Sequence, residues 1–184
     1  MKILLISGKS ASGKDALADA LYTELFNQEK KVLRIHFGDP VKWLAKLAYN
    51  WDGNKDVAGR ELLQTLGTTK MRNYDNTYWA RILSEYIAAI TPYNDFDYVI
   101  IPDLRFMSEF ETICAYNNDV VTIRVNRYDT QGRPYYNPKM TIKQLTHISE
   151  CELDHFNFEY IIENSGSLAD LADAAHLLLE DLTK

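Results

Sequence analysis

The spacing Gly8-x-x-x-x-Gly13-Lys14 is typical of a loop that binds the phosphates of a nucleoside triphosphate. Two glycines let the backbone curl so that consecutive N–H groups face a phosphate, and the dipole of a following helix favours negative charge there. Lys14 would add a mobile positive charge for the outer phosphates. The next position is usually Ser or Thr, whose hydroxyl holds magnesium, but here it is Asp15. The segment therefore predicts a phosphate site with an unusual final residue.

The residues around this motif favour a phosphate loop over two other interpretations. Ile3–Ile6 is an apolar run typical of a buried strand, and the apolar positions between Leu17 and Leu25 have helical spacing. A tight glycine turn that opens an ordinary α/β unit is the simplest alternative. A dinucleotide-binding fingerprint fits worse, because it would need glycine at Ser10. The order strand, loop and helix is the context that a phosphate loop requires.

A carboxylate and a guanidinium follow another apolar run, Tyr98–Pro102, as Asp103 and Arg105. A carboxylate beside a phosphate loop can hold magnesium, directly or through a water molecule. The planar guanidinium of Arg105 matches the oxygens of a phosphoryl group. The alternative is that Asp103 caps the following helix, which is a common use of Asp. The two roles are compatible, and we expect the functional one.

Other candidates carry a weaker signal. Asp39 is followed by a proline, and this pair is a standard signal for the start of a helix. Because Asp39 and Lys42 come shortly after a predicted strand, a role in ligand binding stays open for both. Arg60 and Gln64 share one helical face and can hold a phosphate and a base edge, but ordinary surface residues have the same spacing. A tryptophan such as Trp79 packs in a hydrophobic core more often than it stacks on a nucleotide base.

Composition excludes several classes of function. The chain has 184 residues, 46% of them apolar, and a net charge of −6, which together indicate one globular domain. Without a cluster of Lys and Arg, nucleic acid is not expected as a partner. Cys114 and Cys151 lack metal-ligand spacing, and we expect both to be reduced in a cytoplasmic protein. No apolar stretch approaches the roughly 18 residues of a membrane span, so a membrane partner is not expected either.

Apolar strands alternate with amphipathic helices along the chain, which predicts an α/β fold with a parallel sheet covered on both faces. The expected strands are 3–7, 32–37, 98–102, 120–125 and 160–163. The expected helices are 14–29, 40–49, 59–66, 76–90, 105–117 and 167–182. Since ligands bind at the carboxyl edge of such a sheet, Gly8, Asp39, Asp103 and Asn126 should lie along one rim.

Two segments are longer than this alternation needs. About sixty residues with three helices lie between the second and third strands, and a polar segment rich in turn formers runs from Arg127 to Phe158. In a phosphoryl-transfer enzyme they would be an acceptor-binding insert and a closing lid, although both can also be insertions without function. Cations on the second segment, together with Arg124 just before it, suit closure over a polyphosphate; those on the segment are Arg127, Arg133, Lys139, Lys143 and His147.

Taken together, these motifs resemble the phage-type deoxynucleoside monophosphate kinases, a branch of the P-loop kinases. The resemblance covers most of the chain in order: Ser-Gly-x-x-x-Ser-Gly-Lys-Asp at 7–15, Leu-Gln-x-Leu-Gly-Thr at 63–68, Tyr-Trp at 78–79, Ile-Pro-Asp-x-Arg at 101–105, Thr-His-Ile-Ser-Glu at 146–150 and Asn-x-Gly-Ser-Leu at 164–168. It also accounts for Asp15, because this family places Asp after the loop lysine. The match is poorer at 39–58, where base specificity is expected, and at 128–145.

The resemblance implies a three-layer P-loop kinase fold with a five-stranded parallel sheet in the order 2-3-1-4-5. It implies a single domain with a core at 1–38, 92–126 and 159–184, an acceptor-binding insert at about 39–91 and a lid at about 127–158. The implied reaction is Mg²⁺-dependent transfer of the γ-phosphoryl group of ATP to a deoxynucleoside monophosphate. The implied partner is this small molecule, for a monomer or homodimer in the cytoplasm, which would be the host's if the protein is phage-encoded.

The resemblance also assigns roles by matching position. The ATP phosphates would be held by Gly8, Ser10, Ala11, Ser12, Gly13, Lys14, Asp15 and Ala16. Asp15 and Asp103 would organise Mg²⁺, and Lys14, Asp103, Arg105 and Arg127 would serve the transfer itself. The acceptor site would include Arg60, Gln64 and Gly67, and the lid would include Arg127 and the segment 146–150. Further candidates for binding the acceptor are Asp39, Lys42, Trp79, Arg105, His147 and Glu150.

Two alternatives remain open from the residues. A related kinase that acts on a hydroxyl or a phosphometabolite, such as a dephospho-coenzyme A kinase or phosphomevalonate kinase, would use Asp39 as the base for a hydroxyl acceptor. In that case Asp39→Asn would abolish turnover, whereas with a monophosphate acceptor it should mainly weaken binding. The other alternative is a regulator that binds ATP without transferring phosphate, and the presence of Lys14, Asp103 and Arg105 together counts against it.

Overall fold

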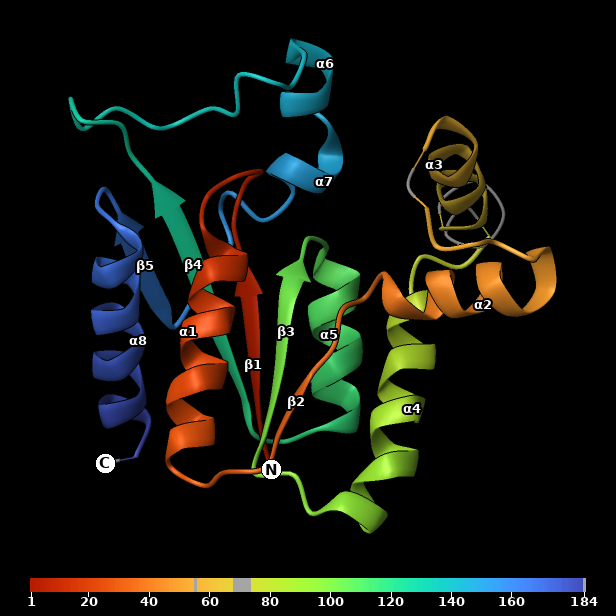
Figure 1. The fold of residues 1–184 in the computed structure, drawn as a ribbon, viewed down its shortest axis with the longest axis horizontal. Coiled ribbons are helices and arrows are strands. Elements are labelled where there is room, and N and C mark those ends of the chain that lie inside the picture. The colour runs from red at the N-terminus through yellow and green to blue at the C-terminus, as the bar shows by residue number, and fades with distance from the viewer. Residues whose placement is uncertain (55, 68–73, 184) are drawn as a thin grey trace.

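The computed structural model describes residues 1–54, 56–67 and 74–183, and for Val57 and Arg60 it describes the backbone alone. Its described strands form one parallel sheet in the order β2-β3-β1-β4-β5, as expected. The strands are β1 (Lys2–Ser7), β2 (Val32–Arg34), β3 (Tyr98–Leu104), β4 (Val120–Arg127) and β5 (Tyr160–Asn164). All of them point toward the upper edge in Figure 1, where the loop between β1 and α1 also lies.

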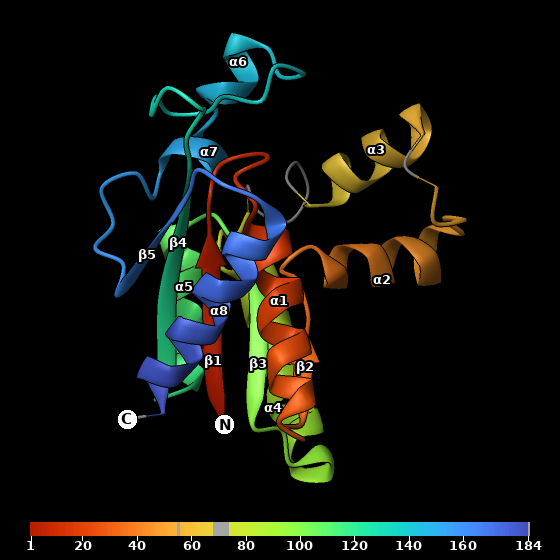
Figure 2. The same cartoon turned by 60° about the vertical axis from the view of Figure 1, so that its left-hand side comes forward.

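Helices cover both faces of the sheet, and Figure 2 shows α1 and α8 on one side with α4 and α5 on the other. The helices are α1 (Lys14–Asn27), α2 (Asp39–Tyr49), α3 (Val57–Gln64), α4 (Tyr78–Asn94), α5 (Met107–Tyr116), α6 (Ile142–Leu145), α7 (Ile148–Cys151) and α8 (Leu168–Leu182). The three-layer α/β arrangement predicted from the sequence is therefore confirmed.

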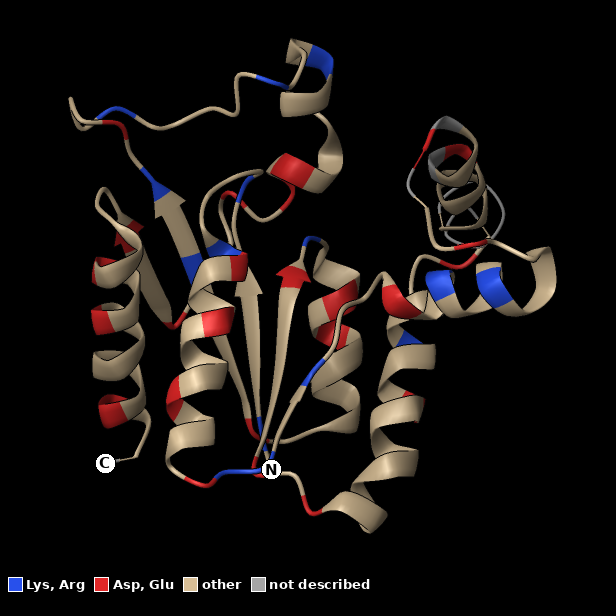
Figure 3. Cartoon of the chain, viewed as in Figure 1, with Lys and Arg blue, Asp and Glu red and all other residues tan. Residues whose placement is uncertain are grey.

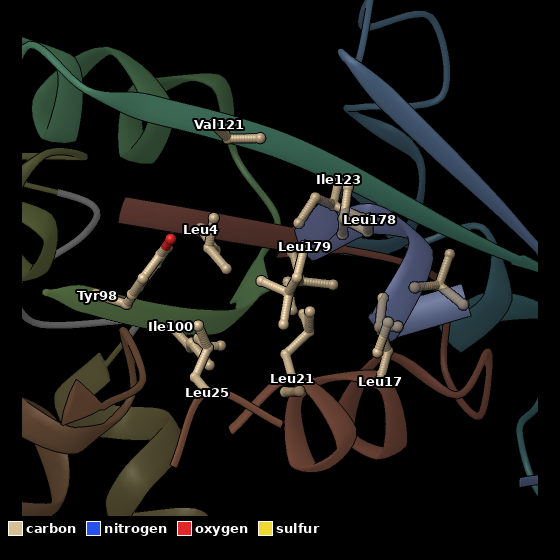
Figure 4. Packing of buried hydrophobic residues seen from close by; sticks show 14 residues of the cluster. Leu4, Leu17, Leu21, Leu25, Tyr98, Ile100, Val121, Ile123, Leu178 and Leu179 are labelled. Atoms are coloured by element: carbon tan, nitrogen blue, oxygen red, sulfur yellow. The ribbon is translucent and has the colours of Figure 1, made fainter. Parts of the chain in front are cut away.

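Two buried cores follow from the two-residue period of the strands. In β1, Leu4 and Ile6 pack with α1 and α8, whereas Ile3 and Leu5 pack with α4 and α5. Figure 4 shows the first of these cores, in which leucines of α1 point toward those of α8 over one face of the sheet. Because β1 is central and fully buried on both faces, the loop that follows it is held on a rigid support.

The second strand is shorter than predicted, since β2 ends at Arg34 rather than at Phe37. The N–H of Ile35 still donates to Ile100 of β3, but the N–H groups of Phe37 and Gly38 turn to the carboxylate of Asp103. The chain leaves the sheet here because a side chain, rather than a neighbouring strand, satisfies its backbone donors.

The helix after β3 also begins later than predicted, at Met107 rather than at 105. The buried carboxylate of Glu109 accepts hydrogen bonds from the N–H groups of Arg105 (2.9 Å) and Phe106 (3.1 Å), which closes the first turn. Asp103 lies within β3, so the alternative that Asp103 caps this helix is wrong.

Two parts of the chain project beyond the sheet in Figure 1. Helices α2 and α3 extend sideways, with a small core of their own that includes Val41, Leu66 and Trp79. The segment 127–158 rises above the carboxyl edge and contains α6 and α7, which the sequence did not predict. Thr141 caps α6 in a reciprocal pair with Gln144, a signal that a four-residue helix makes easy to miss. Among the described residues, no helix has the length and apolarity needed to cross a membrane.

Candidate active site

The loop between β1 and α1 has a conformation that requires its glycines. Gly13 adopts a φ of +100°, and Ala11 also has a positive φ, of +62°. A Cβ atom at Gly13 would lie 2.5 Å from Asn164 Nδ2, and one at Gly8 would lie 2.3 Å from Ser12 Oγ. Left-handed residues within such a loop turn its N–H groups inward, which creates an anion-binding concavity. The predicted phosphate loop thus has the backbone shape that its chemistry needs.

The lysine of the motif and the residues after it open α1. Lys14 is 8% exposed, and its Nζ lies 3.5 Å from the Asp15 carboxylate. Asp15 and Ala16 occupy the first turn of the helix, where the Asp15 side chain remains 61% exposed. Arg34 of β2 lies 3.9 Å from Asp15 and also pairs with Asp19. The unusual Asp15 therefore stands between two cations and faces solvent.

Ser10 of the loop is in contact with the segment 127–158 through both its backbone and its side chain. Its N–H donates to Glu150 Oε2 at 2.8 Å, and its hydroxyl accepts from Asn137 Nδ2 at 3.0 Å. Next to it, the Ala11 carbonyl accepts from the Arg127 guanidinium at 3.0 Å. The projecting segment is thus placed against the loop by three hydrogen bonds, in which Asn137 and Arg127 donate and Glu150 accepts.

A buried arginine of the sheet, Arg124, also connects the loop after β1 with the segment 127–158. Arg124 of β4 is 8% exposed, donates to Ser7 Oγ at 3.1 Å and pairs with Asp154 at 2.8 Å. Asp154 also pairs with Lys9 of the loop at 2.8 Å. The prediction that Arg124 is a cation of a mobile lid is wrong, because this residue lies inside the sheet with its charge already paired.

The Asp103 carboxylate lies at the end of β3, where it accepts from the N–H of Phe37 at 2.9 Å and that of Gly38 at 3.4 Å. Burial raises the pKa of this carboxyl, and the two backbone donors oppose that shift. Figure 3 shows charges of both signs gathered at this end of the sheet and in the segment above it. Asp103 therefore lies half-buried at the predicted rim, with its carboxylate held by two backbone donors.

Arg105 reaches from the end of β3 to the segment above. Its guanidinium pairs with the Glu150 carboxylate and donates to the Ser149 carbonyl at 3.1 Å. Glu150 is 8% exposed and binds Arg105 and the Ser10 N–H with different oxygens. A single carboxylate thus connects the phosphate loop with the arginine that was predicted to bind a phosphoryl group.

A cavity of about 410 Å³ lies between this arginine and the projecting helices. Five predicted site residues line it: Gly67, Trp79, Asp103, Arg105 and His147. The lining also includes apolar residues that the sequence did not single out, among them Phe37, Val41, Phe106 and Ile148. A cavity with an apolar wall and a few convergent polar groups is the usual form of a small-molecule site.

Trp79 both packs in the core of the projecting helices and shapes this cavity. It is 4% exposed, and its indole Nε1 donates to the Gly67 carbonyl at 3.0 Å. Gln64 is exposed at the end of α3, away from the cavity lining, and the side chain of Arg60 lies outside the described part of the chain.

Asp39 begins α2 beside the end of β2. Partial burial raises the pKa of its carboxyl, but hydrogen bonds from the His36 side chain, from Lys42 and from the His36 N–H outweigh this, so that the pKa lies well below its ordinary value. The distances are 2.6 Å from Lys42 Nζ and 2.8 Å from the His36 N–H. Such a carboxylate is a weak base and is held in the charged form.

Several residues of the site were not predicted from the sequence. Glu109 fixes the turn that carries Arg105, Asp154 pairs with the loop, and Asn164 donates to the Ser12 carbonyl at 2.8 Å. Two of them had a local signal: Asn164 opens the motif Asn-x-Gly-Ser-Leu, and Glu109 accepts from the N–H groups at the start of its own helix. The contact of Asp154 with Lys9, in contrast, joins residues far apart in the sequence and depends on the tertiary structure.

The sheet order, with a Gly-x-x-x-x-Gly-Lys loop after the central strand, defines the class of P-loop kinase folds. Solved kinases share this fold across nearly their whole length. An adenosine phosphosulfate kinase of Mycobacterium tuberculosis, in complex with AMPPNP and APS, has a TM-score of 0.52 at 15% identity, covering 97% of both chains. A sugar kinase from Janibacter sp. has a TM-score of 0.56 at 12% identity, covering 98% of this chain and 95% of that one.

The family model of deoxynucleotide monophosphate kinases matches residues 50–174, and the chain belongs to this family. It is similar to the deoxynucleotide monophosphate kinase of Escherichia phage RB69, with 32% identity over 117 residues. The aligned part is 61% of this chain and 41% of the phage protein, so the chain spans less than half the length of that relative. The resemblance predicted from the motifs is thereby confirmed.

Proposed function

We propose that this protein transfers the γ-phosphoryl group of ATP to a deoxynucleoside monophosphate, giving the diphosphate and ADP. The observation that carries the proposal is the position of Arg105, which lines the 410 Å³ cavity and is linked through Glu150 to the N–H of Ser10 in the phosphate loop. A donor site and an acceptor site thus meet at one guanidinium. Phosphoryl transfer needs this kind of positioning and charge neutralisation more than it needs covalent chemistry.

In the donor site, the loop from Gly8 to Lys14 would bind the ATP phosphates through its inward N–H groups. The hydroxyl of Ser12 supports this role, since it is buried and has no hydrogen-bond partner among the described residues. Lys14 would neutralise the outer phosphates, and Arg105 and Arg127 would neutralise the group in transfer. Arg127 donates to the Ala11 carbonyl of the loop, so its guanidinium lies next to the loop that would bind the phosphates.

The residues present fit a magnesium ion of the kind that nucleotide kinases use. Mg²⁺ is usually bound by one or two carboxylates together with substrate phosphates and water, rather than by a cage of protein ligands. Asp15 and Asp103 supply two such carboxylates beside the loop, and the described residues contain no group of three or more potential metal ligands. The ion would neutralise charge on the phosphates, with Asp15 and Asp103 holding it.

In the acceptor site, the cavity beside Arg105 would hold the monophosphate. Gly67 and Trp79, which are joined by a hydrogen bond, would form one part of its wall, and His147 of the segment 127–158 would form another. Asp39, Lys42, Arg60, Gln64 and Glu150 remain candidates for polar contacts around it. We place the acceptor-binding insert at about 39–91 and the lid at about 127–158, on a core made of 1–38, 92–126 and 159–184.

A hydroxyl acceptor is the less favoured alternative. It would require Asp39 to remove a proton, and the lowered pKa of this carboxyl makes it a poor general base. A phosphate acceptor needs no such base, because its oxygen is already ionised. The charged groups around Asp39 therefore favour binding of a polar substrate over proton abstraction.

The proposal is tested by ADP release from Mg·ATP with each common ribo- and deoxyribonucleoside monophosphate, with dephospho-coenzyme A as the competing acceptor. We expect turnover with at least one deoxynucleoside monophosphate. Lys14→Ala should lower kcat by about 100-fold or more, since a positive charge that would stabilise the transferred group is lost. Lys30→Ala is the matched control, because Lys30 follows α1 at the opposite end of the helix. ADP release with dephospho-coenzyme A alone, or full activity of Lys14→Ala, would contradict the proposal.

A further inference from the structure

The Glu150 carboxylate occupies a position that the proposed function assigns to a phosphate. The N–H of Ser10 belongs to the anion-binding loop, and Arg105 is the arginine proposed to bind the phosphoryl group. Glu150 binds the first at 2.8 Å and forms an ion pair with the second. Its side chain is 6% exposed, so this carboxylate is enclosed between the two.

A carboxylate and a phosphate compete for these partners because both are anions that accept from N–H donors. Charged acceptors make the stronger hydrogen bonds, and a bidentate arrangement with arginine adds geometric selection. One N–H cannot donate fully to two anions at once, and the same holds for the Arg105 nitrogen Nη1 that contacts Glu150. A phosphate can therefore take this place only when Glu150 leaves it.

The surrounding contacts show what else would move with Glu150. This residue lies in α7, and Glu152 and Asp154 lie within three residues of the end of that helix. Asp154 holds Lys9 of the loop, and Asn137 of the same segment holds the Ser10 hydroxyl. Displacement of Glu150 thus acts on a segment with several contacts to the loop.

We infer that Glu150 is an internal anion that bridges the Ser10 N–H of the loop and the Arg105 guanidinium, and that a polyphosphate ligand displaces it. This inference rests on the proposed function, because it takes the loop to be the polyphosphate site. It adds that Arg105 is released to the phosphoryl group only when the loop is filled. The chain would thereby couple donor binding to the availability of its acceptor-side arginine.

The test is the affinity of the full chain for tripolyphosphate and for ATP, each without an acceptor, measured by calorimetry. In Glu150→Gln the competing charge is absent, and we expect binding to tighten by roughly tenfold, since a charge-assisted contact no longer opposes the ligand. Glu150→Ala should act in the same direction. Glu152→Gln is the control: it removes an equal charge two residues away, where Glu152 binds the N–H of Met107 at 2.7 Å.

The outcomes separate the inference from the proposed function. Unchanged or weaker binding in both Glu150 variants, with tight binding in the wild type, overturns the inference and leaves the proposed function standing. Equal tightening in Glu152→Gln also overturns it, because general electrostatics would then explain the effect. If the wild type binds neither ligand at millimolar concentration, the proposed function fails and the inference with it.

Hydrogen exchange on the wild type gives a second measurement that needs no variant. The Ser10 N–H should be protected in the free chain, and tripolyphosphate should speed exchange in residues 148–154 while the loop stays protected. A purely structural Glu150 would leave exchange in 148–154 unchanged or slower on ligand binding, and that result would overturn the inference.

Discussion

Asp103 shows how a candidate site residue can lower the stability of the folded state. Its carboxylate is half-buried at the end of β3, and desolvation raises its pKa above the ordinary value. An unfolded carboxyl ionises near pH 3.9, so over the interval above this value the unfolded chain releases a proton that the folded chain retains. The stability of the folded state therefore falls as the pH rises from about 4 through the folded-state pKa.

Asp103→Asn should remove this dependence, because the amide does not ionise. We expect the free energy of unfolding of the variant, relative to the wild type, to increase between pH 4 and pH 7, as measured by urea unfolding. Asp39→Asn provides a control that should show no such change between pH 4 and pH 7, because its pH dependence has the opposite sign and lies below this interval. The pKa of Asp39 is lowered, so its contribution is present above about pH 4 and is lost only as the pH falls below that value. A difference for Asp103→Asn that does not vary with pH would contradict the prediction.

At the scale of elements, the junction between β1 and α1 depends on Gly13. This residue combines a left-handed backbone with a close approach to Asn164, which follows from the neighbouring position of β5 and its loop. A side chain here would meet both a conformational and a steric penalty. The junction is thus set by two elements that lie far apart in the sequence.

Gly13→Ala should therefore destabilise the chain by more than Gly132→Ala. Gly132 also has a positive φ, of +75°, but a Cβ atom there would have no neighbour within 4 Å. The control should cost about 1–2 kcal/mol from conformation alone, whereas Gly13→Ala should cost more and also weaken ATP binding. Urea unfolding and calorimetric titration with ATP provide the two measurements. Equal losses of stability in the two variants would show that the contact with Asn164 is unimportant.

At the scale of the whole molecule, the packing of α1 against α8 joins the start of the chain to its end. Leucines of the two helices meet over β1 and β4 in one continuous core, as Figure 4 shows. The phosphate loop lies at the top of α1, so this core also supports the site. Loss of packing far from the loop is expected to destabilise the fold as one cooperative unit.

Leu178→Ala should cost about 2–5 kcal/mol of unfolding free energy, because it leaves a cavity in this core. Leu177→Ala is the matched control on the same helix: Leu177 is 64% exposed, whereas Leu178 is 4% exposed. The control should change stability by less than about 0.5 kcal/mol. Thermal and urea unfolding should agree on this ranking, and similar losses in the two variants would contradict the core assigned to α8.

Local patterns predicted the repeating elements well and their ends less well. The apolar run of β1 and the glycine spacing after it were sufficient for the strand, the loop and the helix, because each depends on neighbours in sequence. The end of β2 was wrong because Asp103, 66 positions away, takes the N–H of Phe37. The start of α5 was wrong for a local reason, since Glu109, four positions further along, satisfies the N–H of Arg105 in a helix cap.

By itself, the sequence determined the α/β class, the phosphate loop and the residue types of the site, since these follow from periodicity and from turn chemistry within short stretches. Its motifs also identified the family. Only the tertiary structure decided that Glu150 binds Ser10, 140 positions away, and that Arg124 is buried and paired rather than part of a lid. The physical reason is that charges choose their partners by distance in space, and the packing of the sheet and helices sets that distance.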